Sequence, residues 1–252
     1  MKERPILFSA PMVRAILACT KTQTRRVMSL HPSAIACCCG GTAARWVSEG
    51  DRWHCGTCGG GARLRPRDVE YARCPYGQPG DRLWVRETWR VGAWLHRDRG
   101  GRLADAIAAD YRADGHARRE WLPCRDREQF RRLVKQSIDD AKKAGIKQYS
   151  ADTYNWDYGK GPTRWRPSIH MPRWASRLLL EVASVRVERL QSISPEDALA
   201  EGIVQLRDGG YGLPAGEYYH HSDPSQSFFQ LWADINGPGS VEANPWVWVI
   251  NF

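Results

Sequence analysis

Residues 31–74 constrain the fold most, because this stretch is rich in cysteine and glycine and poor in long apolar side chains. Cys55 and Cys58 form a Cys-x-x-Cys that three glycines follow at 59–61, and a row of three cysteines stands at 37–39. A stretch of this composition has little apolar surface to bury. We therefore expect the flanking segments to form the core and residues 31–74 to be an insertion between them.

The cysteines predict a structural zinc ion. A Cys-x-x-Cys turn with glycines lets both thiolates reach one tetrahedral metal. The row at 37–39 lacks a clean Cys-x-x-Cys, so the second ligand pair stays open, and a glycine- and cysteine-rich loop with free thiols is the alternative. Short hairpin strands are expected at 46–47 and 52–54, between the pairs. The predicted ligands are Cys37, Cys39, Cys55 and Cys58, with Cys38 and Cys74 as alternates.

Composition narrows the class of protein. The 252 residues are 42% hydrophobic and 26% charged, which fits one sizeable core with insertions. Neither an apolar leader nor an apolar run of about 20 residues is present, so we expect a cytoplasmic protein with no membrane partner. In a reducing compartment, the cysteines are expected to bind a metal rather than to form disulfides. The net charge of +9 favours a nucleic-acid partner, although a merely solvated basic surface accounts for it equally.

The hexapeptide at 21–26, Lys-Thr-Gln-Thr-Arg-Arg, is the densest polar motif. A short apolar strand at 5–8 and a helix that Pro11 opens precede it, which delivers the motif to a defined place. It carries one amine, two hydroxyls and two guanidiniums, and this is too much polar chemistry for a core. We interpret it as one wall of a site for a polar ligand, anionic or similar to a nucleobase.

A second insertion is expected at 92–168. Residues 109–113 predict a strand, and residues 127–145 predict a helix because Phe130, Leu133, Val134 and Ile138 recur at helical spacing. Gly145 is a plausible helix end. Five basic residues occupy the other face of this helix, which we interpret as a solvated face.

The loop at 165–174 contains two prolines that exclude a regular strand or helix. Its Arg166, His170, Arg173 and Trp174 present cations and an aromatic plane suited to phosphates and bases. Glu87 ends a predicted strand at 82–89 on its apolar side, and it is either a satisfied core carboxylate or a cleft acid.

The last third of the chain alternates strands and helices. Strands are predicted at 178–190 and 246–252, and a helix at 228–235. Ser194 followed by a proline predicts the start of another helix, which stops at Gly202. Glu201 therefore lies at a helix C-terminus, where an acid opposes the helix dipole, so another role is expected for it.

In this order, the segments resemble the ASCH family, a branch of the PUA-like β-barrels. The resemblance covers about half of the chain, and Cys19 stands where members of the family usually have glycine. Residues 2–27 and 165–177 also resemble phage and prophage proteins with this domain. The resembling stretches are 6–8, 18–26, 80–85, 178–190, 198–202, 228–235 and 246–252.

The resemblance implies an α+β fold: a PUA-like, mostly antiparallel β-barrel with short flanking helices. The ASCH domain would comprise 1–30 and 75–252. A zinc-ribbon-like insertion at 31–74 and a partly helical insertion at 92–168 would decorate it. The family is associated with RNA and modified nucleobases, so the implied partner is a nucleic acid or a modified nucleoside in a bacterial or phage setting.

One branch of the family is similar to amidohydrolases that remove the acetyl group from N4-acetylcytidine. Their catalytic Lys, Thr and Glu match Lys21, Thr24 and Glu201 here. In this reading, Lys21 is the base, Thr24 the nucleophile and Glu201 the acid that protonates the leaving amine. The expected substrate-binding residues are Arg25, Arg26, Glu87, Arg166, His170, Arg173 and Trp174.

Two other functions remain open from the sequence. The same residues suit a binder without chemistry, with Lys21 and Arg26 on phosphate and Thr24 and Glu201 on a base edge. A phage assembly or host-interaction protein with no catalysis is the third hypothesis.

Overall fold

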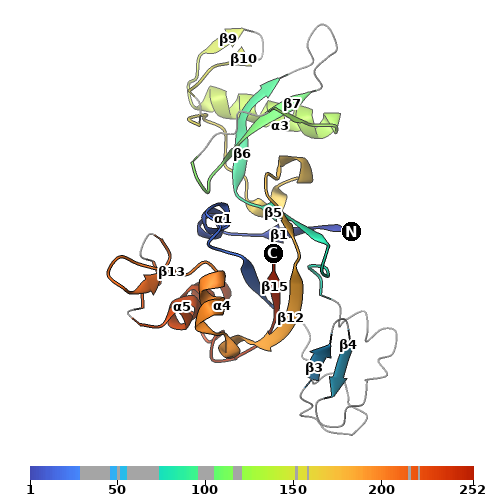
Figure 1. Ribbon diagram of the computed structural model, residues 1–252. Coiled ribbons are helices and arrows are strands. Elements are labelled where there is room, and N and C mark those ends of the chain that lie inside the picture. The colour runs from blue at the N-terminus through green and yellow to red at the C-terminus, as the bar shows by residue number, and fades with distance from the viewer. Residues whose placement is uncertain are drawn as a thin grey trace. The chain divides into compact units, whose positions relative to one another are not determined.

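The computed structural model describes residues 1–28, 74–95, 105–115, 121–150, 153–157, 159–214, 217–220 and 222–252, and the backbone of two further strands at 46–49 and 52–55. The described residues form an α+β protein of small sheets and short helices (Figure 1). They divide into two compact units. Unit 1 contains Met1–Arg4, Ala15–Arg82 and Glu181–Phe252, and unit 2 contains Pro5–Arg14 and Leu83–Leu180.

A three-stranded antiparallel sheet lies at the centre of unit 1, in the order β12-β15-β2. The middle strand β15 (Trp246–Asn251) has Val247, Val249 and Ile250 fully buried, because a central strand loses solvent on both faces. The flanking strands are β12 (Ser184–Arg189) and β2 (Gln23–Val27). Val27 and Val247 are paired across β2 and β15, and so are Gln23 and Asn251, so residues far apart in the sequence meet in one ladder.

Two helices accompany this sheet in unit 1. The first, α4 (Pro195–Ala200), begins at Ser194, whose hydroxyl accepts a hydrogen bond from the Asp197 amide, as the sequence predicts. The second, α5 (Pro224–Asn236), begins four residues before the predicted start because Asp223 caps it. The small elements of unit 1 are η4 (Leu190–Ser192), β13 (Val204–Gln205), β14 (Tyr211–Gly212), β3 (Trp46–Glu49) and β4 (Arg52–Cys55).

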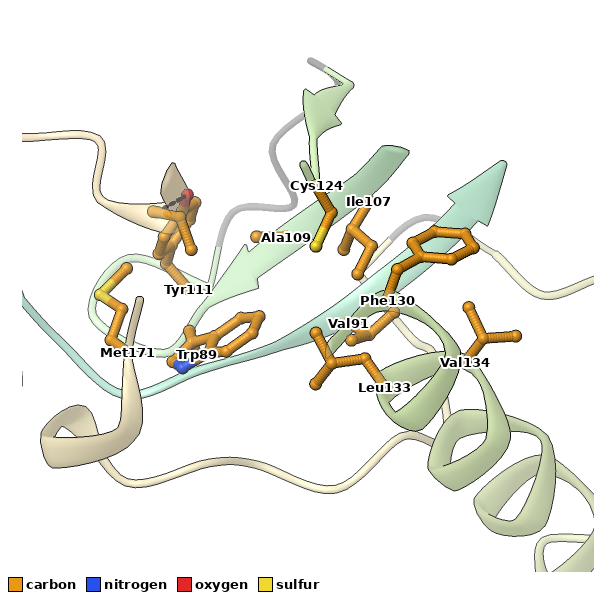
Figure 2. Packing of buried hydrophobic residues seen from close by; sticks show 11 residues of the cluster. Trp89, Val91, Ile107, Ala109, Tyr111, Cys124, Phe130, Leu133, Val134 and Met171 are labelled. Atoms are coloured by element: carbon orange, nitrogen blue, oxygen red, sulfur yellow. Dashed lines mark hydrogen bonds between the residues drawn. The ribbon is translucent and has the colours of Figure 1, made fainter. Parts of the chain in front are cut away.

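Unit 2 is built from the antiparallel sheet β6-β7-β8 and the long helix α3 (Arg127–Lys143). Phe130, Leu133 and Val134 of α3 point toward the sheet, where Trp89 and Ile107 meet them (Figure 2). Each such side chain contributes about 1.5–3 kcal/mol when it leaves water. The strands are β6 (Trp89–Leu95), β7 (Ala106–Tyr111) and β8 (Leu122–Pro123).

Smaller elements complete unit 2. Two short strands, β9 (Gln148–Ser150) and β10 (Thr153–Tyr154), follow α3 and pair antiparallel. The proline-containing loop holds two 3-10 turns, η2 (Ser168–His170) and η3 (Arg173–Ala175), which agrees with the exclusion of a regular strand or α-helix.

A second three-stranded sheet has the order β1-β5-β11. Its strands are β1 (Glu3–Leu7), β5 (Arg82–Arg86) and β11 (Leu179–Glu181). The strands predicted within 178–190 both form, but β11 and β12 belong to different sheets rather than to one ladder. The helix α1 (Ala10–Leu17) buries Met12, Val13 and Ile16, whereas Leu17 at its end is 43% exposed.

The predicted hairpin of the cysteine-rich stretch is confirmed in its backbone. Strands β3 and β4 pair antiparallel, and Trp46 lies opposite Cys55. Of the predicted zinc ligands, Cys37, Cys38, Cys39 and Cys58 lie outside the described residues. No helix in the described part of the chain is both long enough and apolar enough to cross a membrane.

Candidate functional site

The turn after α1 places Lys21. Cys19 adopts a φ of 56°, the left-handed conformation that glycine prefers, and its amide hydrogen-bonds to the Ile16 carbonyl. The amides of Thr20 and Lys21 both reach the Ala15 carbonyl, at 2.9 and 3.2 Å. The turn thereby ends the helix and sends the chain into β2.

A backbone bridge joins the start of the hexapeptide to the end of α4. Lys21 and Glu201 form an isolated antiparallel bridge, and the Thr22 amide donates to the Ala200 carbonyl at 2.9 Å. Gly202 follows with a φ of 99°, and a Cβ there would lie 3.3 Å from the Lys21 Cβ. A glycine is therefore required here both by its conformation and by the close approach of Lys21.

Lys21 and Glu201 form a buried ion pair. The Lys21 Nζ lies 2.6 Å from Glu201 Oε2 and 2.8 Å from the Glu201 carbonyl oxygen. Both residues are 3% exposed. Burial lowers the pKa of the Lys21 amine from its ordinary value of 10.5, with the Glu201 carboxylate acting in the opposite direction. The positive charges of Arg26 and Arg25 add to the lowering of this pKa.

Arg25 extends the pair into a network. Its side chain is fully buried and lies 2.7 Å from Asp197, 3.0 Å from Glu188 and 3.4 Å from Glu201. Its guanidinium also lies 5.8 Å from the centre of the Phe228 ring of α5. One guanidinium therefore faces three carboxylates through its two terminal nitrogens.

Arg186 of β12 joins the same carboxylates. Its guanidinium lies 2.6 Å from Asp197 and also pairs with Glu188, and it donates to Gln23 at 3.2 Å. Burial tends to raise the pKa of Asp197, but hydrogen bonds and charges from Arg25 and Arg186 outweigh it, and the pKa is lowered. The charged cluster thus consists of Lys21, Arg25, Arg186, Glu188, Asp197 and Glu201, all in unit 1.

Thr24 and Arg26 alternate with Gln23 and Arg25 along β2, so the two pairs face opposite sides of the strand. Thr24 is 4% exposed, and its hydroxyl forms no hydrogen bond to any described residue. Burial lowers the pKa of Arg26. The structure therefore brings Lys21 and Glu201 into contact and places Thr24 three residues along the same segment.

The other predicted binding residues belong to unit 2, and two of them are engaged there. Arg166 is 9% exposed, donates to Gln136 at 3.0 Å and lies 5.6 Å from the centre of the Trp89 ring. Trp174 donates to Gln129 at 2.8 Å and meets Trp89 edge to face. His170 and Arg173 lie exposed on their 3-10 turns.

Glu87 is a satisfied carboxylate of unit 2, one of the two interpretations that the sequence leaves open. It is 2% exposed, and its two oxygens accept from Arg177 at 2.8 and 2.9 Å. Arg177 also pairs with Asp114 at 2.6 Å and lies 4.2 Å from the centre of the Tyr111 ring. The two carboxylates raise the pKa of Arg177 against the effect of its burial.

Asp197, Glu188 and Arg186 are site residues that sequence reasoning missed. The sequence offers Asp197 only as a first-turn residue of α4. The signal that was available is the pair Arg186 and Glu188, which place two charges on one face of a strand whose other face holds Val185 and Val187.

No group of three or more His, Cys, Asp or Glu side chains suited to a metal ion occurs among the described residues. Cys74 is half-buried, and burial raises the pKa of its thiol to about 11. Comparisons of the chain with models of known protein families, with curated proteins and with solved structures find no match. The function is therefore inferred from the residues and their geometry.

Proposed function

We propose that unit 1 is an ASCH-type, PUA-like domain that binds a modified cytosine nucleoside and hydrolyses its N4-acyl amide. The observation that carries the proposal is the Lys21–Glu201 pair, which joins two residues 180 positions apart at 2.6 Å in a buried place. Ionisable pairs that burial perturbs are typical of catalytic acids and bases. The left-handed Cys19 supports the family assignment, because the family usually has glycine at this turn.

Lys21 and Glu201 share one proton, and its position decides which of them can act as a base and which as an acid. When that proton moves from Lys21 Nζ to Glu201, the ion pair becomes a neutral amine beside a neutral carboxylic acid. Burial favours the neutral form of the Lys21 amine. The amine then serves as the base and the acid as the proton donor, so one transfer prepares both.

The reaction would proceed in two stages, the acylation of Thr24 and the hydrolysis of the resulting ester. Lys21 takes the Thr24 hydroxyl proton while Thr24 Oγ bonds to the acyl carbon, and Arg26 stabilises the oxyanion. The bond from the acyl carbon to N4 then breaks, and Glu201 gives its proton to the leaving amine. A water molecule hydrolyses the acyl-Thr24 ester, which releases the acid and restores the hydroxyl and the shared proton.

Binding without chemistry is the second candidate, and one contact favours it. The Lys21 ammonium donates to both the carboxylate and the carbonyl of Glu201. In this arrangement it is held by Glu201 rather than by the Thr24 hydroxyl. A site of this kind would recognise the base edge and leave it unchanged.

Chromatography of N4-acetylcytidine incubated with the protein tests the hydrolase. We expect cytidine to be released by the wild type and by Thr22→Ala, and not by Thr24→Ala. Thr22 is the matched control, since it is an exposed threonine two residues away. Lys21→Arg keeps a cation beside Glu201 but cannot act as a base, so it should bind the nucleoside without turnover. Binding by the wild type with no release of cytidine would establish the second candidate instead.

The proposal extends to a structural zinc in the cysteine-rich stretch. The β3–β4 hairpin places Cys55 at the end of a strand, three residues before Cys58, as a zinc-ribbon turn requires. The row at 37–39, with Cys74 as a substitute, would supply the other thiolates. Metal analysis of protein purified without chelator should give about one equivalent of zinc, and less than about a tenth of an equivalent would exclude the site.

A further inference from the structure

The outer face of α3 carries positive charges that unit 2 does not use. Helical geometry places these residues opposite the face that Phe130, Leu133 and Val134 bury. The residues are Arg131, Arg132, Lys135, Lys142 and Lys143, which we call the basic face of α3, and all are exposed.

No residue of the basic face forms an ion pair with a described residue, although acids stand within reach along the helix. Glu128 precedes Arg131 and Arg132 by three and four positions, and Asp139 precedes Lys142 and Lys143 in the same way. These are the spacings at which helical ion pairs form. The cations are thus presented to solvent with their charge not neutralised within the described chain.

Other arginines of unit 2 behave differently. Arg90, Arg164 and Arg177 each pair with a carboxylate at 3.0 Å or less. Unit 2 therefore contains carboxylates that pair with arginines, but they do not pair with the basic face. Its three N-terminal members also lie in the half of the helix where a cation gains nothing from the helix dipole.

We propose that the basic face of α3 binds the phosphate backbone of a polynucleotide. From Arg131 to Lys143 the helix rises about 18 Å, a length along which one strand in B-form geometry carries about five phosphates. Exposed arginines and lysines in such a row release counterions from the backbone without reading the bases. This surface is separate from the Lys21–Glu201 pair, and the proposal does not depend on the hydrolase.

Fluorescence anisotropy with labelled RNA and DNA strands of mixed sequence, about 20 nucleotides long, tests the surface. The variant Arg131→Glu/Arg132→Glu/Lys135→Glu should bind at least about tenfold more weakly than the wild type. Its slope of log affinity against log salt should be smaller by about 2. The control Lys2→Glu/Arg112→Glu/Arg207→Glu makes the same change in net charge at scattered exposed sites and should retain most of the affinity.

Three outcomes would overturn the proposal. Equal losses in both variants would show an effect of net charge rather than of this face. Wild-type protein without affinity for either strand at about 50 mM salt would exclude a polynucleotide. Binding to phosphatidylserine vesicles, with no affinity for the strands, would make the partner a membrane surface. Circular dichroism should show that both variants keep the wild-type helix content, since the substituted side chains are exposed.

Discussion

The charged cluster of unit 1 and the basic face of α3 hold positive charge in opposite ways. Lys21 and Arg25 are buried and face three carboxylates, and the half-buried Arg186 pairs with two of them. The five cations of α3, in contrast, face solvent without a carboxylate partner in the described chain. A buried cation needs its partners to offset desolvation, but an exposed cation needs none. Net charge therefore says little about function until each cation is assigned to one of these two settings.

The largest expected effect separates the two faces of α3. Phe130→Ala should lower the free energy of unfolding by about 4 kcal/mol, because it leaves a cavity beneath the helix. Arg131→Ala, one position away on the basic face, should change it by less than about 0.5 kcal/mol. Denaturation by urea, followed by circular dichroism, measures both. A loss of more than about 1 kcal/mol in Arg131→Ala would mean that the basic face contributes to the fold.

The next effect concerns the Lys21–Glu201 pair. Lys21→Met should destabilise the protein by about 3 kcal/mol, since it leaves a buried carboxylate without its lysine. The double variant Lys21→Met/Glu201→Leu should recover most of this loss, because both charges are then removed. A double-mutant cycle from urea denaturation gives the coupling. Additive single effects would contradict a direct pairing.

A substitution at Gly202 tests how closely the backbone at this position approaches Lys21. Gly202→Ala should lower the free energy of unfolding by about 2 kcal/mol, since it combines a positive φ with contacts to Ala15 and Lys21. Gly209→Ala is the matched control, with a φ of 89° and open space around the new Cβ. It should cost about 1 kcal/mol, the effect of the backbone alone. Equal losses would show that the contact with Lys21 is not tight.

The smallest effect depends on pH. The pKa of Asp197 is lowered from its ordinary value of 3.8 in the folded state, so its stabilisation is present above pH 3.8 and is lost as the pH falls through the folded pKa. Asp197→Asn should cost about 1 kcal/mol at neutral pH, and the difference from wild type should shrink below pH 3.8. Thermal unfolding across pH measures this.

The sequence predicted the helices of this protein better than their ends. Periodicity identified α3 and its start at residue 127, where the structure has it, with Asp126 as the N-cap. Asp223 followed by proline likewise marks the true start of α5. Such caps depend on residues within one helical turn, so the sequence itself contains the information that specifies these helix starts.

The site was less accessible from sequence. Lys21 and Glu201 came from a resemblance, whereas the partners Asp197, Glu188 and Arg186 depend on which face of β12 meets α4. That choice follows from the register between β12 and β15, which no local pattern specifies. Arg166 and Trp174 pack against Trp89 in unit 2, and their predicted role in binding a ligand stays a prediction.

The position of β15 has a consequence for the order of folding on the ribosome. β15 lies between β12 and β2, so neither outer strand can gain its ladder partner until residues 246–251 have left the exit tunnel. Unit 2 ends at Leu180 and is complete earlier in synthesis. Domains generally fold as units while the chain grows. The helix with the basic face can therefore form while β2, which carries Thr24, is not yet paired with β15.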